Sequence, residues 1–182
     1  MLTAAGVKVV EFNARFGDPE AMNTLPVLNT DFLDVLVAAR EGESLPQLSF
    51  APRATVCKYA VPAGYPTDPE SGARVTVDEE TIERVNARYQ GDPDESGAVV
   101  DGGATAEALL FYASVDERDD GIYTTTSRAF AVVGIAETIS VAEEVAEDAL
   151  EAAGEGVRIR HDIGKPDLVQ RRIDHVAELG GE

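Results

Sequence analysis

The sequence predicts an α+β fold, with a strand and a helix first and a mixed, mostly antiparallel small domain after them. Three observations support this prediction. Apolar and polar side chains alternate over residues 7–16, as in a half-buried strand. Residues 30–42 follow the period of an amphipathic helix. Short apolar runs separated by turn residues then recur over residues 53–135, which favours antiparallel strands.

A segment with two prolines, residues 44–52, separates these two parts and predicts a linker. We therefore expect one unit over residues 1–48 and a second over residues 49–182. The chain has 182 residues, of which 44% are hydrophobic, so it can supply the core of one domain and a piece of another.

The first unit is expected to open with a strand hairpin, because residues 4–6 form a turn sequence between residues 1–3 and the strand at 7–16. Thr30 or Asp31 can cap the following helix, which should end near Gly42. The apolar residues of this helix share one face: Phe32, Leu33, Leu36 and Val37.

The second unit begins with alternating strand, loop and helix patterns. The expected elements, in order, are a strand at 53–61, a Pro/Gly-rich loop at 62–72, a short strand at 74–77, a helix capped by Asp78 and ended by Gly91, and an exposed acidic loop at 91–103. Residues 108–115, 122–126 and 128–135 then predict an antiparallel meander.

The last part of the chain predicts two helices around a short strand. Residues 140–143 fit a capping box that opens an Ala-rich helix ending at Gly154. A short strand is expected at 157–160. Asp167 should cap a final helix over residues 168–179, which Gly180 closes.

The chain is strongly acidic, with 34 acidic and 15 basic residues and a net charge of −19. Nucleic-acid and anionic-membrane binding need clustered Lys and Arg, so we expect neither kind of partner. Dispersed acid with 12 arginines and 3 lysines resembles cytoplasmic proteins of salt-loving microbes, so we expect a cytoplasmic, halophilic protein. No apolar run approaches ~20 residues, and the first residues lack a signal-peptide pattern.

Few residues offer soft metal ligands or a nucleophilic thiol. Cys57 is the one cysteine, which excludes an internal disulfide, and its place in a predicted strand favours a buried, inert thiol. His161 and His175 are the only histidines, which argues against a zinc site. His161 and Asp162 are adjacent and should point to opposite sides, so we interpret residues 160–164 as a packing turn.

The strongest functional pattern is a polar row on the strand at 7–16. Glu11, Asn13 and Arg15 fall on one face, about 7 Å apart in succession. Carboxylate and amide oxygens suit Mg²⁺, and a guanidinium suits a phosphate or carboxylate. A solvent-exposed polar face with ion pairs is the alternative, and the spacing alone leaves both open.

A turn and a helix start follow this row directly. Gly17 permits a sharp turn, Asp18 can cap a helix, Pro19 suits the first helical position and Glu20 suits the first turn. Asp18 and Glu20 can also touch a substrate or metal at the helix N-terminus. Simple capping is the alternative for Asp18.

The stretch Glu11-Phe12-Asn13-Ala14-Arg15-Phe16-Gly17-Asp18-Pro19-Glu20 resembles the signature of the phosphoribosylamine–glycine ligase (glycinamide ribonucleotide synthetase) family, ATP-grasp enzymes of purine synthesis. Further matches lie at Gly64-Tyr65-Pro66, at residues 128–150 and at Arg160-His161-Asp162-Ile163-Gly164. The chain departs from the family pattern at Thr126-Ser127-Arg128, where two glycines would precede the arginine. Residues 81–105 have no clear counterpart.

The resemblance implies a remnant of the ATP-grasp C-terminal lobe followed by the C-terminal domain of such a ligase. The implied reaction joins glycine to 5-phosphoribosylamine at the expense of ATP. Glu11 and Asn13 would ligate Mg²⁺ or Mn²⁺, and Arg15 would be the catalytic residue that stabilises charge. ATP, glycine and 5-phosphoribosylamine are the implied partners.

The chain lacks a phosphate-cradling loop, since Gly102-Gly103 lies in an acidic stretch without a basic neighbour and reads as a turn. Family members are much longer, so we expect a C-terminal portion, inactive alone, with the nucleotide cradle elsewhere. Val10, Phe12, Ala14 and Phe16 should then expose an apolar face that binds the missing N-terminal half or a second copy. Two alternatives are another ATP-grasp ligase or carboxylase and a non-catalytic acidic interaction module.

Overall fold

The structure is a computed structural model, and it describes residues 1–12, 14–90 and 105–180. The chain opens with the expected hairpin, in which β1 (Leu2–Thr3) pairs antiparallel with β2 (Gly6–Val7). The predicted strand over residues 7–16 is wrong beyond Val7, because the described residues that follow form no strand. A strand needs a neighbour to take its backbone hydrogen bonds, and none of the described strands runs beside this segment.

Two short helical elements precede the first long helix. They are α1 (Glu20–Thr24) and the 3₁₀ helix η1 (Leu25–Val27). The helix α2 (Phe32–Glu41) confirms the prediction from sequence. The Asp31 side chain accepts a hydrogen bond from the Leu33 amide, and Gly42 ends the helix with a positive φ of 72°.

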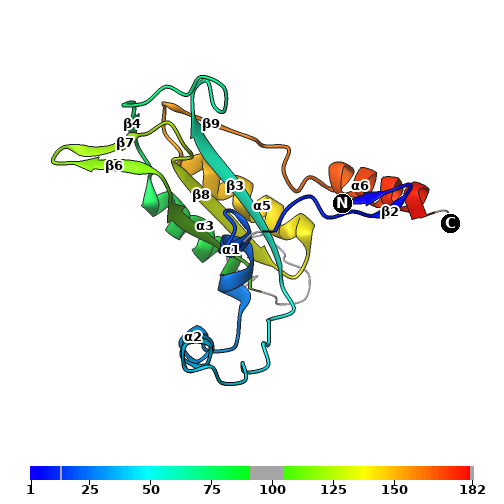
Figure 1. Cartoon of the computed structure of the whole chain (residues 1–182). Helices are drawn as coiled ribbons and strands as arrows, with labels where there is room; N and C mark the ends of the chain where they lie inside the picture. The colour runs from blue at the N-terminus through cyan, green and yellow to red at the C-terminus, as the bar shows by residue number, and fades with distance from the viewer. Residues whose placement is uncertain (13, 91–104, 181–182) are drawn as a thin grey trace.

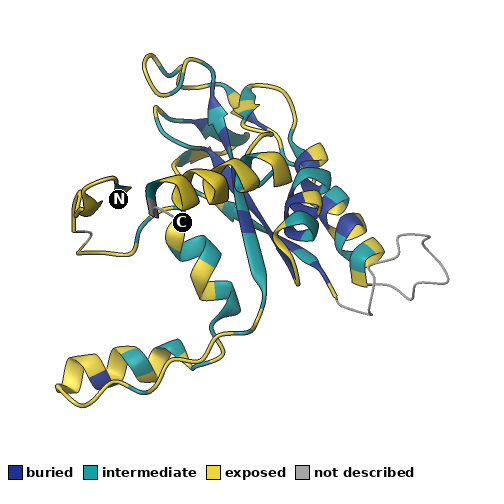
Figure 2. Cartoon of the chain, turned by 90° about the vertical axis from the view of Figure 1, so that its right-hand side faces the viewer, coloured by how far each residue is buried: buried dark blue, intermediate teal, exposed yellow. Residues whose placement is uncertain are grey.

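The linker at residues 44–52 contains no helix and runs back beside the residues that precede α2. Leu28 and Phe50 form an isolated antiparallel bridge. The Ser49 amide donates to the Thr30 hydroxyl at 2.8 Å. The Thr55 hydroxyl donates to the Asn23 carbonyl at 3.1 Å, which ties the start of β3 (Ala54–Pro62) to α1. Figures 1 and 2 show α2 projecting away from the main sheet.

The main sheet has four antiparallel strands in the order β5-β8-β3-β9. Their bounds are β3 (Ala54–Pro62), β5 (Glu107–Tyr112), β8 (Phe130–Ala136) and β9 (Val157–Ile159). All seven residues of β8 are buried, and the core lies between this sheet and α5 (Ile139–Ala149), with α3 (Glu79–Gln90) beside it. Figure 2 shows the buried residues concentrated in these elements.

A second, three-stranded sheet follows the order β4-β7-β6. Its strands are β4 (Arg74–Val75), β6 (Val115–Arg118) and β7 (Gly121–Thr124). The predicted meander is therefore wrong in its pairing: β6 and β7 form a hairpin within this sheet, and β8 pairs with β5 instead. The predicted loop at residues 91–103 lies outside the described residues.

Both predicted caps of the last two long helices are wrong. Thr138, not Ser140, caps α5 by accepting from the Val141 amide at 3.3 Å. The helix ends at Ala149, and the 3₁₀ helix η2 (Leu150–Ala152) follows it. The final helix, α6 (Pro166–Gly180), begins before Asp167, whose carboxylate instead pairs with Arg171 at 2.9 Å. It contacts the N-terminal hairpin, so the two ends of the described chain lie side by side (Figure 1).

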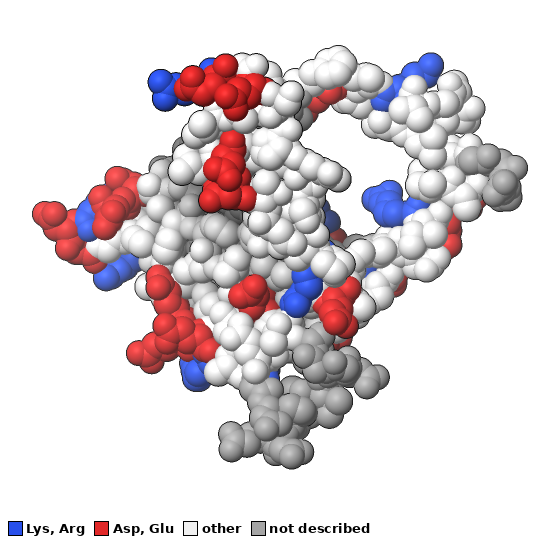
Figure 3. Space-filling view, turned by 90° about the horizontal axis from the view of Figure 1, so that it is seen from below, with Lys and Arg blue, Asp and Glu red and all other residues white. Residues whose placement is uncertain are grey.

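The described helices include none that is both long and apolar enough for a membrane crossing. Figure 3 shows acidic side chains spread over this face, with basic side chains beside several of them. The charge is therefore distributed over several elements, as the sequence indicated.

Candidate functional site

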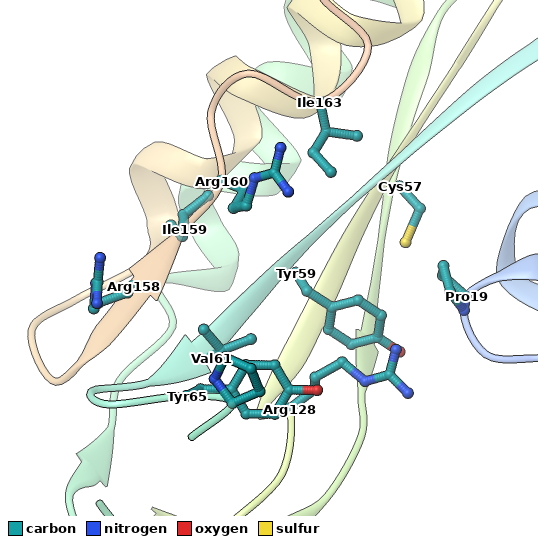
Figure 4. Close-up of a pocket in the computed structure, with 11 residues that line it drawn as sticks. Pro19, Cys57, Tyr59, Val61, Tyr65, Arg128, Arg158, Ile159, Arg160 and Ile163 are labelled. Carbon is teal, nitrogen blue, oxygen red and sulfur yellow. The ribbon is translucent and has the colours of Figure 1, made fainter. Parts of the chain in front are cut away.

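A pocket of about 510 Å³ lies on the face of the main sheet that is turned away from α5. Alternate residues of β3, among them Tyr59, line it, whereas Lys58 points to the opposite face and contacts α5. The pocket falls in the size range of small-molecule sites. Figure 4 shows residues from its wall, which is formed by Pro19, Cys57, Tyr59, Val61, Tyr65, Pro66, Arg128, Arg158, Ile159, Arg160 and Ile163.

Asp18 joins the N-terminal unit to this pocket. Its carboxylate pairs with the Arg128 guanidinium at 3.2 Å and accepts a hydrogen bond from the Tyr59 hydroxyl. Arg128 also donates to the Asp18 carbonyl at 3.1 Å and lies over the Tyr59 ring, 4.8 Å from its centroid. Burial and the hydrogen bond to Asp18 raise the pKa of Tyr59. Asp18 is therefore not a helix cap: the cap position of α1 is Pro19, with no side-chain cap hydrogen bond.

Three arginines, Arg128, Arg158 and Arg160, line the pocket of a chain whose net charge is −19. Arg160 is held by two hydrogen bonds to Asp162, at 2.9 and 2.5 Å, which fix the plane of its guanidinium. Guanidinium groups bind phosphate and carboxylate groups through paired N–H donors. The pocket can therefore bind an anionic small molecule.

Cys57 is half-buried in the pocket wall and forms no disulfide. Burial, followed by the nearby Asp18 charge, raises the pKa of its thiol to about 12. The thiol is thus neutral at physiological pH, in line with the inert role expected from the sequence.

The residues that the sequence singled out for chemistry come earlier in the chain than the residues that line this pocket. Glu11 is exposed, Arg15 donates to the Phe16 carbonyl at 3.0 Å, and Asn13 lies outside the described residues. Among the described residues, no strand carries Glu11 or Arg15, because β2 ends at Val7. Over residues 1–12, 14–90 and 105–180, no three His, Cys, Asp or Glu side chains group as a metal site. Gly102-Gly103 is likewise outside the described part of the chain.

The motifs near the C-terminus behave largely as the sequence indicated. The side chains of His161 and Asp162 turn apart, toward Glu147 and Arg160 respectively, and form no acid–base pair. Gly64 occupies a turn with a positive φ of 75°, as interpreted. The following Tyr65 also lines the pocket, a role that the turn interpretation missed.

Sequence reasoning did not identify Tyr59 or Arg158 as site residues. The signal available was alternation: odd-numbered residues of β3 share one face, and Arg158 of the edge strand β9 stands two residues before Arg160, which follows that strand. The β3 residues and the two arginines come together because β3 pairs with β9. This pairing joins residues about 100 positions apart in the chain.

The fold and the pocket define a small α+β domain that can bind an anionic ligand. Residues 55–166, more than half of the chain, match the family described as phosphoribosylglycinamide synthetase, C domain. The chain belongs to this family.

Relatives with the same domain are much longer than this chain. The phosphoribosylamine–glycine ligase of Methanosarcina barkeri is 48% identical over 183 residues, which cover 100% of this chain and 36% of the relative. That of Methanocaldococcus jannaschii is 44% identical over 180 residues, again 36% of its length. The crystal structure of phosphoribosylamine–glycine ligase from Thermotoga maritima has a similar fold, with a TM-score of 0.60 and 24% identity over 85% of this chain and 32% of that one.

Proposed function

We propose that this chain forms part of a phosphoribosylamine–glycine ligase and contributes both the Glu11–Glu20 signature and an anion-binding pocket to its active site. The contact between Asp18 and Arg128 carries the proposal, because it places the end of the signature at the wall of the pocket. The names of the relatives support the reaction, and their greater length supports a second polypeptide region as part of the working enzyme.

The proposed reaction has two steps. The carboxylate of glycine attacks the γ-phosphate of ATP, giving glycyl phosphate and ADP. The amine of 5-phosphoribosylamine then attacks the acyl carbon and displaces phosphate. Arg15 stabilises the negative charge that develops on the transferred phosphoryl group. Arg158 and Arg160 bind an anionic group of a substrate, for which we propose the phosphate of phosphoribosylamine.

Glu11 and Asn13 would hold the metal ion, because their carboxylate and amide oxygens are suitable ligands for Mg²⁺ or Mn²⁺. A bound Mg²⁺ offsets the charge of the phosphates during transfer. Mg²⁺ usually takes one or two protein ligands and completes its coordination with substrate phosphates and water, which two ligands from this chain would match.

An apolar surface on the first unit is the proposed contact with the rest of the ligase. Phe12 is 90% exposed, and the Phe16 ring packs edge-on against Phe32 of α2, which joins the signature to this helix. A patch of this kind marks an interaction surface. Its exposed members are Val9, Val10, Phe12, Phe16, Leu33, Leu36 and Val37. The proposed occupant is the region of the relatives that this chain does not match, which would also carry the ATP cradle.

The proposal is tested by mixing this chain with the unmatched region of the Methanosarcina barkeri relative, expressed as a separate polypeptide. We expect a complex that forms glycinamide ribonucleotide from ATP, glycine and phosphoribosylamine, whereas neither polypeptide alone does so. Glu11→Gln should abolish turnover while the complex still forms, and Glu43→Gln, at an exposed residue between α2 and the linker, serves as the control.

Two results would contradict the proposal. A complex without turnover would favour a non-catalytic interaction module. Self-association of the chain, without binding of the second polypeptide, would assign the apolar surface to a second copy of the chain instead.

A further inference from the structure

Lys58 is a charged residue of the core that the proposed reaction does not use. It lies on β3 with its side chain 0% exposed, on the face of the sheet opposite the pocket. Its ammonium donates to Glu143 Oε1 and to Glu147 Oε2, each at 2.5 Å, and to the carbonyl of His161 at 3.1 Å. The ammonium thus joins the sheet and α5 to the turn that follows β9.

Two more contacts complete this group of charges, which we call the Lys58 cluster (Lys58, Glu143, Glu147, His161 and Lys165). His161 Nδ1 lies 2.5 Å from Glu147 Oε1, and Lys165 Nζ lies 2.8 Å from Glu143 Oε1. Two ammonium groups thereby face two carboxylates. A buried charge is tolerated only when it is paired and hydrogen-bonded. If the turn at residues 160–164 moved away from the sheet and α5, these groups would become exposed or lose a partner.

The turn at residues 160–164 lies between the cluster and the pocket. Arg160 and Ile163 line the pocket, whereas the His161 carbonyl faces Lys58. Gly164 lies close against the core: an added Cβ would stand 2.8 Å from a methyl group of Val56. One short turn therefore carries pocket residues on one side and cluster contacts on the other.

The backbone pairing of this region is too short to fix the turn by itself. β9 pairs with β3 only from Val157 to Ile159, opposite residues 60–62. From Arg160 onward the chain departs from the sheet, and the Lys58 cluster provides the next contacts with the body of the domain.

We propose that Lys58 is a positioning residue, whose cluster holds the 160–164 turn so that Arg160 faces the anion pocket. This inference rests on the proposed function of the pocket. The cluster touches no substrate and acts only through the turn. Loosening it should weaken anion binding without disordering the sheet.

The test compares Glu147→Gln with Glu144→Gln, an exposed glutamate on the same helix. Glu147→Gln keeps the shape of the side chain and removes its charge from Lys58 and His161. We expect amide hydrogen exchange over residues 157–165 to accelerate about tenfold, while β3 and β8 exchange as in the wild type. Glu144→Gln should change neither region. A uniform acceleration throughout the domain, or none, would overturn the positioning role.

Ribose 5-phosphate titrated calorimetrically into the same variants gives the second readout. We expect its dissociation constant to rise about fivefold or more in Glu147→Gln and to stay unchanged in Glu144→Gln. An unchanged constant in folded Glu147→Gln would refute the inference.

If Glu147→Gln does not fold, His161→Ala replaces it, because the His161 side chain is 61% exposed and its loss leaves Lys58 paired with both glutamates. The same local acceleration of exchange is then expected, and its absence contradicts the inference. A wild-type protein that does not bind ribose 5-phosphate would instead refute the proposed function of the pocket, and the exchange comparison alone would decide the role of Lys58.

Discussion

The guanidinium of Arg128 lies 3.2 Å from the carboxylate of Asp18, a residue 110 positions earlier in the chain. This contact joins the segment before α1 to the residues that lead into strand β8. It therefore places the Asp18 end of the Glu11–Glu20 segment at the wall of the pocket.

We predict that Asp18 and Arg128 are energetically coupled. A double-mutant cycle with Asp18→Asn and Arg128→Met should give a coupling free energy of about 1 kcal/mol, since the pair is partly buried and Arg128 also lies over Tyr59. Urea denaturation measures it. The exposed Arg171–Asp167 pair on α6 is the control, with an expected coupling of about 0.3–0.5 kcal/mol. A coupling of zero for Asp18 and Arg128 would show that other contacts hold the segment before α1 against the main sheet.

Lys58→Met should destabilise the fold strongly. It leaves Glu143 buried without its closest cation, and such a loss costs about 3–5 kcal/mol. Chemical denaturation of the variant measures the change. Lys8→Met removes the same charge at an exposed position and should change the free energy of unfolding by less than about 0.5 kcal/mol. Equal effects of the two substitutions would contradict the pairing of Lys58.

Acid should weaken the contact between Glu147 and the turn. Burial raises the pKa of Glu147, but hydrogen bonds from Lys58 and His161 outweigh this effect and hold the pKa below its ordinary value of 4.5. Because the folded state has the lower pKa, this contribution to stability is present above pH 4.5 and is lost as the pH falls through the folded value. Wild type should therefore lose more stability than Glu147→Gln between pH 5 and pH 3, about the range where carboxylates titrate. Equal losses of stability in the wild type and in Glu147→Gln would contradict the contact of Glu147 with Lys58 and His161.

Salt should stabilise this protein. The net charge is −19, so self-repulsion opposes the compact state and screening relieves it; Figure 3 shows acidic side chains spread over one face. We predict that the melting temperature rises from dilute buffer to about 2 M KCl, where the Debye length is below about 3 Å. The same temperature in both conditions would contradict the halophilic interpretation.

Local sequence signals predicted the elements that depend on local contacts. The helix at Phe32–Glu41 has its cap at Asp31 and its end at Gly42, and both features lie within a turn of the helix. The strand at Ala54–Pro62 was also predicted within a residue at each end. The domain boundary expected near residue 48 remains a prediction.

Non-local pairing explains what the sequence could not predict. The alternation over residues 7–16 had the right period, but a strand forms only beside a partner. On local grounds, the capping box predicted at residues 140–143 was as plausible as the observed cap at Thr138. Glu143 instead pairs with Lys58, 85 residues earlier in the chain, and Thr138 caps helix α5. The pocket likewise depends on β3, β8 and β9 meeting in one sheet.

The most direct test of the central claim, that the pocket serves the ligase reaction, is the KM for phosphoribosylamine in the combined two-polypeptide enzyme. Arg158→Met should raise this KM about tenfold or more, a loss of about 1.4 kcal/mol of binding, and leave the KM for ATP unchanged. Arg84→Met, at an exposed arginine of α3 outside the pocket, should change neither constant. An unchanged KM for phosphoribosylamine in Arg158→Met would contradict the account.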